Sequence, residues 1–560
     1  MKKLELETLY TPFEENLGEI PWDVYPRPQL KRDSYICLNG KWNLAVRHGA
    51  VRVPLGEILV PFPLESRLSG IEHELREDEL LIYERKFTLP DGFKKDRVLL
   101  HFGAVDQICK VFVNGESAGG HEGGYIPFSL DITELLCDGE NTLTAEVSDP
   151  LDTELPYGKQ TKKRGGMWYT PVSGIWQTVW LESVCDKYIE NIKITPASNS
   201  VTIEVIGGSK ESQLILDGKE YNFEKSVTVS PEKAECWTPD NPKLYDFTVI
   251  SGDDKVDSYF ALREVKTEGN KILINGEATF FHGLLDQGYF PDGIFLPATP
   301  EGFEKDILTM KKLGFNMLRK HIKIEPDIFY YYCDKYGMFV FQDLVNSGKY
   351  NFLIDTALPT IGLKRGITHK ASKKRREVFE KTASETVELL YNHPSIVYYT
   401  LFNEGWGQYD AVRLYREMKT LDSTRVWDAT SGWFWTDESD VLSEHIYFKP
   451  LRLKNDGRPL VLSEFGGYSY KAEGHVFNKH NTYGYKFYKD LGVFKEGLYK
   501  LYTEQVVPMV EKENLCATVY TQVSDVEDET NGLFTYDRQL LKVDKAEMQE
   551  IAEKIFKAYK

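Results

Sequence analysis

Two glutamates follow strongly apolar stretches of the chain. Glu404 comes soon after residues 396–402, a β-branched and aromatic run, and Glu464 follows residues 459–462 in the same way. Runs of this kind are typical of parallel strands buried on both faces. Barrel enzymes keep their reacting groups at the carboxyl ends of such strands. The sequence therefore predicts two carboxyl groups at one edge of a sheet.

A pair of carboxyl groups in this position suits glycoside hydrolysis, which needs an acid/base together with a nucleophile or a second base. Retaining enzymes hold the two groups about 5–5.5 Å apart, and inverting enzymes hold them about 6.5–9.5 Å apart. The sequence leaves this distance open. The alternative interpretation is that each glutamate is an ordinary strand-end acid that faces solvent.

Length and composition bound the class of protein. The chain of 560 residues is too long for one domain, so we expect two to four. A hydrophobic content of 41% is ample for large cores and argues against disorder. The formal net charge of −18 argues against nucleic acid or an anionic membrane as a partner. The sequence contains no run of 18 apolar residues, so we expect no membrane span.

The seven cysteines are scattered and show no C-x-x-C spacing, so they imply neither a zinc site nor a disulfide framework. We therefore expect reduced thiols in a cytoplasmic protein. The first ten residues are partly basic but contain no apolar core, and we expect no signal peptide.

Residues 1–184 are predicted to be all-β. The pairs Asn39-Gly40, Asn114-Gly115 and Asp138-Gly139 separate short alternating runs and signal tight turns. Many such turns at short spacing predict a sandwich or jelly roll. No cluster of titratable residues stands out, so a packed accessory domain is expected here.

Five segments of this region resemble, in this order, the sugar-binding domain of glycoside hydrolase family 2. They are Leu-Asn-Gly-Lys-Trp (38–42), Pro-Phe-Pro-Leu-Glu-Ser (61–66), Tyr-Glu-Arg-Lys-Phe (83–87), Val-Phe-Val-Asn-Gly (111–115) and Gly-His-Glu-Gly-Gly-Tyr-Ile-Pro-Phe (120–128). The resemblance implies a jelly-roll domain. Residues 185–264 are again β-like, and their length fits a small immunoglobulin-like sandwich. The segment 237–245 resembles one that family 2 enzymes carry near the end of this domain.

From Gly269 onward, buried strands alternate with amphipathic stretches, which predicts βα units. The helices expected include 301–313 and 493–513, and the eight strand candidates are 279–281, 316–318, 339–341, 396–402, 426–429, 443–446, 460–463 and 517–520. Eight such units over residues 265–560 predict a (β/α)8 barrel. Residues 343–370 and 466–492 are long for barrel loops. The second is rich in aromatic residues and is predicted to be a lid or a sugar-site wall, with plain packing as the alternative.

The same family resemblance assigns roles to the two glutamates. Asn403-Glu404 resembles the acid/base motif of family 2, and the segment 463–466, Ser-Glu-Phe-Gly, resembles its nucleophile motif. The resemblance covers essentially the whole chain. It implies a retaining exo-glycoside hydrolase that cleaves terminal non-reducing sugars by double displacement, with Glu404 as acid/base and Glu464 as nucleophile. Asn403 would then bind the 2-hydroxyl of the sugar, a contact expected to strengthen in the transition state.

Other strand ends supply candidates for substrate binding. They are Asp286 after strand one, Arg319 and His321 after strand two, Trp433 and Trp435 after strand five, His445 and Tyr447 after strand six, and Tyr520 and Gln522 at strand eight. The resemblance implies that Arg319 and His321 correspond to a family arginine and a sugar-facing histidine. It also implies that a tyrosine such as Tyr447 lies near the nucleophile. Taken singly, each of these residues fits a structural role equally well.

The substrate is less constrained than the reaction. The family includes β-galactosidases, β-glucuronidases, β-mannosidases and some arabinosidases. Its glucuronidases carry Asn-x-Lys after strand eight, whereas Asn531 is followed here by Gly532 and Leu533. The acidic run 525–529 would also repel a uronate. We therefore expect a neutral sugar, and a β-galactoside on family frequency.

We expect no cofactor and no metal, because the chain lacks the extra carboxyl-terminal domains of the largest family β-galactosidases and their metal requirements do not transfer. A carbohydrate is the expected partner, and a homo-oligomer is possible. Two rival interpretations remain. One is a catalytically silent carbohydrate-binding protein, against which the presence of both glutamates argues. The other is unrelated barrel chemistry, for which we find no phosphate or metal motif.

Overall fold

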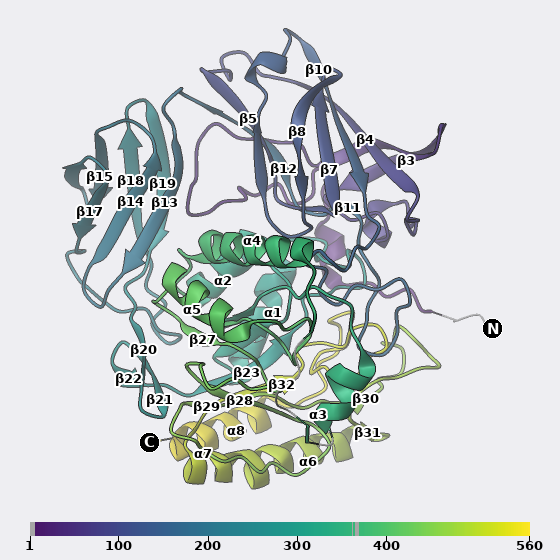
Figure 1. The fold of residues 1–560 in the computed structure, drawn as a ribbon, viewed down its shortest axis with the longest axis vertical. Helices are drawn as coiled ribbons and strands as arrows, with labels where there is room; N and C mark the ends of the chain where they lie inside the picture. The colour runs from purple at the N-terminus through teal and green to yellow at the C-terminus, as the bar shows by residue number, and fades with distance from the viewer. Residues whose placement is uncertain (1–5, 361, 364–368, 560) are drawn as a thin grey trace.

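The computed structural model describes residues 6–360, 362–363 and 369–559. Two β-sandwiches precede an α/β barrel in the chain, and Figure 1 shows the first sandwich at the top, the second at the upper left and the barrel below. This order confirms the predicted multidomain fold class. Residues 361 and 364–368, in the predicted long loop 343–370, lie outside the described residues.

The first sandwich packs a six-stranded sheet, ordered β3-β2-β4-β10-β7-β8, on a four-stranded sheet, ordered β1-β12-β5-β9. Side chains alternate strictly between buried and less buried in β10, so one face of its sheet lines the core. The strands are β1 (Ile36–Cys37), β2 (Gly40–His48), β3 (Val51–Val60), β4 (Glu79–Thr88), β5 (Arg97–Phe102), β6 (Val105–Asp106), β7 (Ile108–Val113), β8 (Glu116–Glu122), β9 (Phe128–Asp131), β10 (Glu140–Ser148), β11 (Gly174–Ile175) and β12 (Val179–Val184), with the short 3-10 helices η1 (Pro12–Asn16), η2 (Arg67–Ser69) and η3 (Thr133–Leu135).

The second sandwich consists of a three-stranded sheet, β13-β14-β17, and a four-stranded sheet, β16-β15-β18-β19. Its strands are β13 (Ile189–Pro196), β14 (Val201–Gly207), β15 (Ser212–Leu216), β16 (Lys219–Phe223), β17 (Ser226–Val229), β18 (Tyr245–Ser251) and β19 (Asp254–Phe260). The two-residue turn Asp217-Gly218 joins β15 to β16 with positive φ at both residues, as a tight hairpin requires.

Eight parallel strands form a nearly closed barrel with the order β27-β26-β25-β24-β23-β32-β29-β28. They are β23 (Phe281–Asp286), β24 (Met317–Lys320), β25 (Phe339–Asp343), β26 (Ile396–Thr400), β27 (Val426–Asp428), β28 (Leu442–Ile446), β29 (Leu460–Gly466) and β32 (Leu515–Thr521). Each overlaps one of the eight predicted strands. A small sheet of β20 (Val265–Glu268), β21 (Lys271–Ile274) and β22 (Glu277–Ala278) packs its apolar side chains against the barrel interior.

Helices surround the barrel. They are α1 (Glu301–Lys312), α2 (Asp327–Tyr336), α3 (Leu358–Thr360), α4 (Lys373–Leu390), α5 (Ala411–Leu421), α6 (Leu491–Lys500), α7 (Val507–Glu513) and α8 (Lys545–Ala558), with the π-helical segments η4 (Leu353–Ala357) and η5 (Leu501–Val506). Phe303, Ile307 and Met310 bury one face of α1, as their spacing predicts. The predicted helix 493–513 is observed as α6, η5 and α7 in succession. The long loop 466–492 contains two short paired strands, β30 (Tyr468–Tyr470) and β31 (Lys486–Tyr488).

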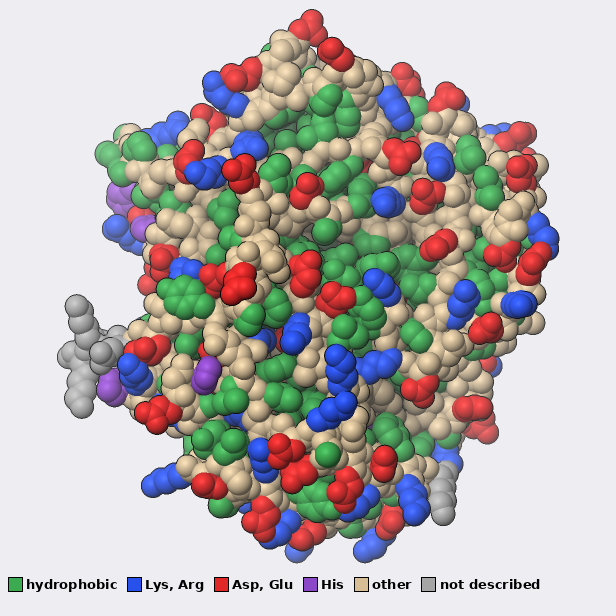
Figure 2. Space-filling view, turned by 180° about the vertical axis from the view of Figure 1, so that it is seen from behind, with side chains coloured by type: hydrophobic (Ala, Val, Ile, Leu, Met, Phe, Trp, Pro, Cys, Tyr) green, Lys and Arg blue, Asp and Glu red, His purple; other side chains and the backbone are tan. Residues whose placement is uncertain are grey.

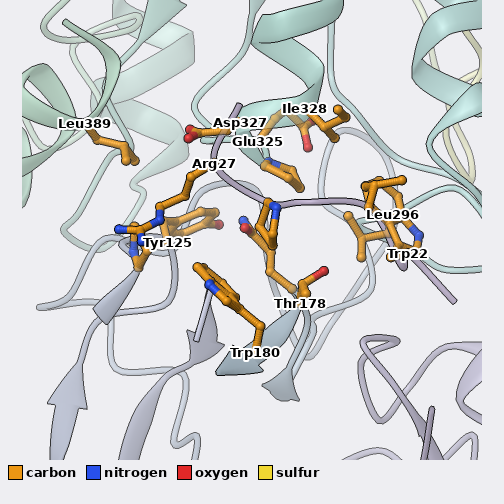
Figure 3. Close-up of a pocket in the computed structure, with 16 residues that line it drawn as sticks. Trp22, Arg27, Tyr125, Thr178, Trp180, Leu296, Glu325, Asp327, Ile328 and Leu389 are labelled. Atoms are coloured by element: carbon orange, nitrogen blue, oxygen red, sulfur yellow. The ribbon is translucent and has the colours of Figure 1, made fainter. Parts of the chain in front are cut away.

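The three parts share buried contacts. One apolar core contains Trp176 of the first sandwich together with Phe295 and Leu296 of the barrel. The indole of Trp237, from the second sandwich, donates to the carbonyl of Asp334 at 2.7 Å. A small cavity of about 60 Å³ remains where the first sandwich meets the barrel, and Figure 3 shows Trp22 and Trp180 among its lining residues. The sandwiches are therefore packed firmly on the barrel.

The surface charge and the cysteines can be read directly from the structure. Figure 2 shows acidic and basic side chains interspersed over the face that it presents. All seven cysteines lie in the described part of the chain, and none of them forms a disulfide. Among the described residues, no helix combines the length and the apolarity that crossing a bilayer requires.

We predict that the buried Arg32 stabilises the contact between the second sandwich and the first. Its guanidinium binds Asp254 at 2.8 Å and Glu182 at 3.0 Å. Arg32→Met should lower the free energy of unfolding by about 3–5 kcal/mol, because Asp254 keeps a buried charge without its partner. Differential scanning calorimetry measures the change. Arg52→Met, on an exposed pair with Glu84, is the control and should cost under about 1 kcal/mol. Equal effects of both substitutions would contradict the prediction.

Candidate active site

The two glutamates lie where strands β26 and β29 end. Glu404 follows β26 by four residues and has a left-handed backbone with φ of 52°, which a non-glycine residue adopts at a cost of roughly 1–3 kcal/mol. Its amide donates to the carbonyl of Ser431 at 2.9 Å, which holds this conformation. Glu464 lies within β29 itself. The strained turn re-aims the Glu404 side chain toward Glu464 across the barrel mouth.

The two carboxyl groups face each other at short range. A carboxyl oxygen of Glu404, one of Glu464 and a ring nitrogen of His445 all lie within 4.8 Å of one another. Glu404 is only 7% exposed and Glu464 only 5%. Two carboxyl groups at this distance, out of water, cannot both ionise freely. One of the two carboxyl groups is therefore expected to keep its proton when the other ionises.

Arg319 organises the surroundings of Glu464. From β24, its Nη1 donates to Glu464 Oε1 at 3.1 Å and to the carbonyl of Ser463 at 2.8 Å. Its Nε donates to Asp343 Oδ1 at 2.9 Å, and its Nη2 donates to Asn403 Oδ1 at 2.8 Å. One buried guanidinium therefore connects the ends of four strands and sets the positions of Glu464 and Asn403.

Tyr447 supplies a second donor to Glu464. Its hydroxyl donates to Glu464 Oε2 and lies 3.0 Å from the hydroxyl of Thr521. Its ring stacks on Tyr485, with 3.6 Å between the centroids. Tyr485 comes from the aromatic loop 466–492, so part of that loop forms a wall of the site. This agrees with the first of the two predicted alternatives, a lid or site wall, rather than with plain packing.

Two histidines complete the polar shell. His445 Nδ1 lies 2.8 Å from Glu404 Oε1, and its Nε2 lies 3.1 Å from the hydroxyl of Ser431. His321 Nδ1 lies 2.9 Å from Asp343 Oδ2, and burial lowers the pKa of His321 to about 3. His321 is therefore a neutral hydrogen-bonding group at physiological pH.

The environments of the two glutamates differ in charge. Burial and the neighbouring charge of Glu464 raise the pKa of Glu404 well above its usual range. Burial also raises the pKa of Glu464, but the Arg319 charge and the hydrogen bond from Tyr447 act in the opposite direction. Glu404 is therefore the group that keeps a proton, and Glu464 is the group that ionises.

Glu404 lines a cavity of about 430 Å³. Trp433, Tyr447, Tyr483 and Tyr485 line it together with Glu404, and Met167 reaches it from the first sandwich. A cavity of this size with aromatic walls and convergent polar groups has the features of a small-molecule site.

The predicted residues Arg319, His321, Asn403, Trp433, His445 and Tyr447 thus gather around the two glutamates, and four others do not. Asp286 accepts from Lys320 Nζ at 2.7 Å within a separate buried ion cluster. Tyr520 points away from the barrel interior and packs against Tyr502 of the helix layer. Successive side chains of a strand face opposite ways, so its neighbour Thr521 reaches the site instead.

Trp435 and Gln522 serve local contacts. The indole of Trp435 donates to the carbonyl of Ser443 at 3.1 Å. Gln522 Nε2 donates to Glu529 at 2.8 Å and to Asn531 at 2.9 Å. The geometry therefore argues against two predicted roles, ring stacking by Trp435 and direct sugar contact by Tyr520.

Besides Thr521 and Met167, sequence reasoning missed Asp343 and Lys159. Asp343 binds both Arg319 and His321, and it ends the apolar strand β25 just as Glu404 follows β26, so the same signal was present. Lys159 comes from the first sandwich, where no sequence pattern pointed to a site, and its Nζ lies 5.8 Å from the ring centroid of Trp406.

The site offers one possible set of metal ligands among the described residues, namely Glu404, His445 and Glu464. Each of these groups already has a hydrogen-bond partner: His445 bonds Glu404, while Arg319 and Tyr447 bond Glu464. These three groups are therefore already joined in one hydrogen-bonded network.

Residues 265–556 match the family of glycosyl hydrolases family 2, TIM barrel domain, and residues 70–175 match the glycosyl hydrolase 2 galactose-binding domain-like family. The chain is 24% identical over 437 residues to a β-galactosidase of Thermoanaerobacter pseudethanolicus, covering 70% of this chain and 54% of the relative. It is 25% identical over 378 residues to a β-glucuronidase of Paenibacillus borealis, covering 60% of each. The chain thus spans about half the length of the curated relatives it matches.

Solved structures share the fold along nearly the whole chain. A β-galacturonidase from Eisenbergiella tayi has a TM-score of 0.70 at 20% identity, with 95% of this chain and 98% of that chain covered. A β-D-glucuronidase of Dictyoglomus thermophilum has a TM-score of 0.75 at 19% identity, with the same coverage. At these identities the likeness establishes the fold.

We predict that the buried proton of Glu404 makes stability fall as pH rises. Above the ordinary carboxyl pKa of about 4.5, the unfolded chain releases this proton while the folded chain keeps it. Glu404 by itself should therefore contribute a loss of about 1.4 kcal/mol of unfolding free energy per pH unit until its raised pKa is reached. Between pH 5 and pH 8, the Glu404→Gln variant should lose less unfolding free energy than the wild type, and thermal unfolding midpoints would measure the difference. Glu277→Gln, at an exposed position, should follow the wild type. A wild-type slope in Glu404→Gln would contradict the prediction.

Proposed function

Because the chain belongs to glycoside hydrolase family 2, we propose that it is a retaining, exo-acting glycoside hydrolase that removes a terminal sugar by double displacement. The observation that carries this proposal is that one carboxyl oxygen of Glu404 and one of Glu464 lie within 4.8 Å of each other. Retaining enzymes hold their carboxyl groups about 5–5.5 Å apart, whereas inverting enzymes need about 6.5–9.5 Å for a water molecule. The short distance therefore favours the retaining route.

In the first step Glu464 is the nucleophile. Its carboxylate attacks the anomeric carbon while the glycosidic bond breaks, and a covalent glycosyl ester forms. Arg319 and Tyr447 point the carboxylate at the sugar and favour its ionised form. Glu404 gives its proton to the departing oxygen, which is the role that its raised pKa suits.

In the second step Glu404 acts as a base. Having lost its proton, it accepts one from a water molecule that attacks the same anomeric carbon, and the ester to Glu464 breaks. His445, 2.8 Å from Glu404, keeps the carboxyl group oriented through both steps. Two displacements at one carbon return the original configuration.

Asn403 is placed to bind the sugar. Its Oδ1 is occupied by Arg319, while its buried Nδ2 has no hydrogen-bond partner among the described residues. The free amide donor lies next to the acid/base, where the 2-hydroxyl of a bound sugar would accept from it. This contact strengthens as positive charge develops at the anomeric carbon.

A β-galactoside is the first candidate substrate. The β-galactosidase relatives support it, and so does the absence of a lysine two positions after Asn531. The acidic run 525–529 supports it less than its composition suggests, because Asp525 is paired with Lys542 at 2.6 Å and Glu527 lies 3.5 Å from Arg164. A β-glucuronide is the second candidate, favoured by the β-glucuronidase relatives at 25% identity.

Two further assignments belong to the proposal. We divide the chain at residues 1–184, 185–264 and 265–560, with the last part carrying both glutamates. We also infer a reducing compartment such as the cytoplasm from the seven unpaired thiols.

We predict that Glu464→Ala abolishes hydrolysis of aryl glycosides, because no nucleophile remains. Glu404→Gln should lower kcat about 10²–10⁴-fold for poor leaving groups, and less for leaving groups that need no proton. Initial rates on β-galactoside, β-glucuronide, β-mannoside, β-glucoside and α-L-arabinoside substrates measure both effects, with the exposed Glu277→Ala as the control. Wild-type turnover in Glu464→Ala, or an inverted product anomer by NMR, would refute the mechanism.

The pH profile of kcat/KM should report the two carboxyl groups. Rates should rise as Glu464 ionises and fall as Glu404 loses its proton. Tyr447→Phe removes a hydrogen bond that lowers the pKa of Glu464, so the rising limb should move to higher pH. Glu404→Gln should lose the falling limb. An unchanged rising limb in Tyr447→Phe would show that Tyr447 does not act on the nucleophile.

A further inference from the structure

The cavity of about 430 Å³ lies on the acid/base side of the reacting pair. Glu404 and His445 line it, whereas Glu464 is not among the described residues of its wall. Tyr447 lines the cavity and donates its hydroxyl to Glu464, so the cavity adjoins the nucleophile without reaching its carboxyl group. In a retaining glycoside hydrolase the acid/base protonates the departing oxygen, and the departing group lies on its side. The cavity is therefore placed to hold the leaving group.

Three aromatic rings contact one another in the wall of this cavity. Phe448 follows the end of β28 by two residues, and its ring centroid lies 5.2 Å from that of Tyr485. Tyr485 in turn stacks on Tyr447, with 3.6 Å between the centroids. Phe448 lines the cavity and yet is 68% exposed. Because it continues an aromatic surface, its exposed ring marks a place that a ligand would cover.

Aliphatic side chains from separate parts of the chain add to the wall. Met167 comes from the first sandwich, Pro359 from α3, Ile446 from the end of β28 and Pro450 from the segment after it. None of these side chains can donate or accept a strong hydrogen bond. A second sugar would bring hydroxyl groups that such a wall leaves unsatisfied, whereas an aromatic leaving group would bury its apolar faces there.

The charged residues of the wall are compatible with an apolar leaving group. Besides the acid/base Glu404, they are the half-buried Glu444 and the exposed Lys449 and Arg452. Since the two cations are exposed, they remain in water, and an apolar leaving group does not have to strip them of their hydration. The aromatic and aliphatic side chains are therefore the part of the wall that selects the leaving group.

The size of the cavity bounds the leaving group. An apolar cavity of about 150 Å³ is enough for one benzene ring, so about 430 Å³ is enough for a fused ring system. We propose that the cavity binds an aromatic, largely apolar aglycone, and that the substrates are aryl glycosides rather than oligosaccharides. The inference rests on the proposed glycoside hydrolase function and specifies its leaving group.

The test places one sugar, the one that the wild type hydrolyses fastest, on a series of leaving groups: methyl, 4-nitrophenyl, 4-methylumbelliferyl and, in a disaccharide, glucose. The proteins are wild type, Phe448→Ala, Met167→Ala and Phe487→Ala. Phe487 serves as the control, because it is 58% exposed and is not among the described residues that line the cavity. Each variant is compared with the wild type on the same substrate, which cancels the intrinsic reactivity of the leaving group.

Phe448→Ala should lower kcat/KM for the 4-methylumbelliferyl glycoside about 3–10-fold, as for the loss of one aromatic pair. Most of this loss should be in KM, because the ring contacts a part of the substrate that does not react. The methyl glycoside and the disaccharide should be affected least, since neither brings an aromatic ring. Met167→Ala should act in the same direction, and Phe487→Ala should match the wild type.

Equal losses on all leaving groups in Phe448→Ala, or a larger loss on the disaccharide than on the 4-methylumbelliferyl glycoside, would overturn the inference. So would a dimer that Phe448→Ala dissociates, measured by light scattering, because the exposed ring would then serve contact between copies. Failure of the hydrolase function would look different, since every glycoside would be inert. In that case a fluorescence titration with free 4-methylumbelliferone still tests the cavity. The wild type should bind it about 3–10-fold more tightly than Phe448→Ala, and equal affinities would overturn the inference.

Discussion

The contact between Arg319 and Glu464 is the interaction on which the site depends. Two carboxyl groups buried within 4.8 Å of each other repel when both are charged, and a barrel mouth offers little water to screen them. The guanidinium of Arg319 stabilises the charge on Glu464 and leaves Glu404 as the protonated member. Since Arg319 also binds Asp343 and Asn403, the same contact fixes the ends of four strands. The different protonation of the two glutamates and the fixed positions of the four strand ends therefore both depend on Arg319.

The first sandwich belongs to the site as much as the barrel does. Its long loop carries Met167 to the cavity wall, and Lys159 of the same loop has its Nζ 5.8 Å from the ring centroid of Trp406. A barrel alone would present two glutamates and a ring of aromatic residues, with little to distinguish one sugar from another. Packing of the sandwich on the barrel through shared apolar core residues keeps the loop in register with the strand ends. The site thus combines groups at or just beyond the strand ends with a cavity wall that loops supply.

The sequence predicted the strand ends well because they have a strong physical signature. A buried parallel strand needs an unbroken apolar run, so a carboxylate just beyond it stands out, as at Glu404 and Glu464. The direction of side chains along the strand was harder to predict: Tyr520 was expected at the site, but the side chains alternate and its neighbour Thr521 reaches the site instead. Asp286 was placed at the right strand end, but Lys320 holds it in a separate ion cluster. Lys159 lies more than 200 residues before Glu404, and only the tertiary fold brings the two together.

The most direct test of the account is to trap the covalent intermediate. The wild-type enzyme would be incubated with a 2,4-dinitrophenyl 2-deoxy-2-fluoro glycoside of its best sugar, which slows release of the ester more than its formation. Peptide mass spectrometry would then locate the fluorosugar. We predict one label per chain, on Glu464. A label on Glu404 or on any other residue, or turnover without a trapped ester and with inverted product, would contradict the central claim.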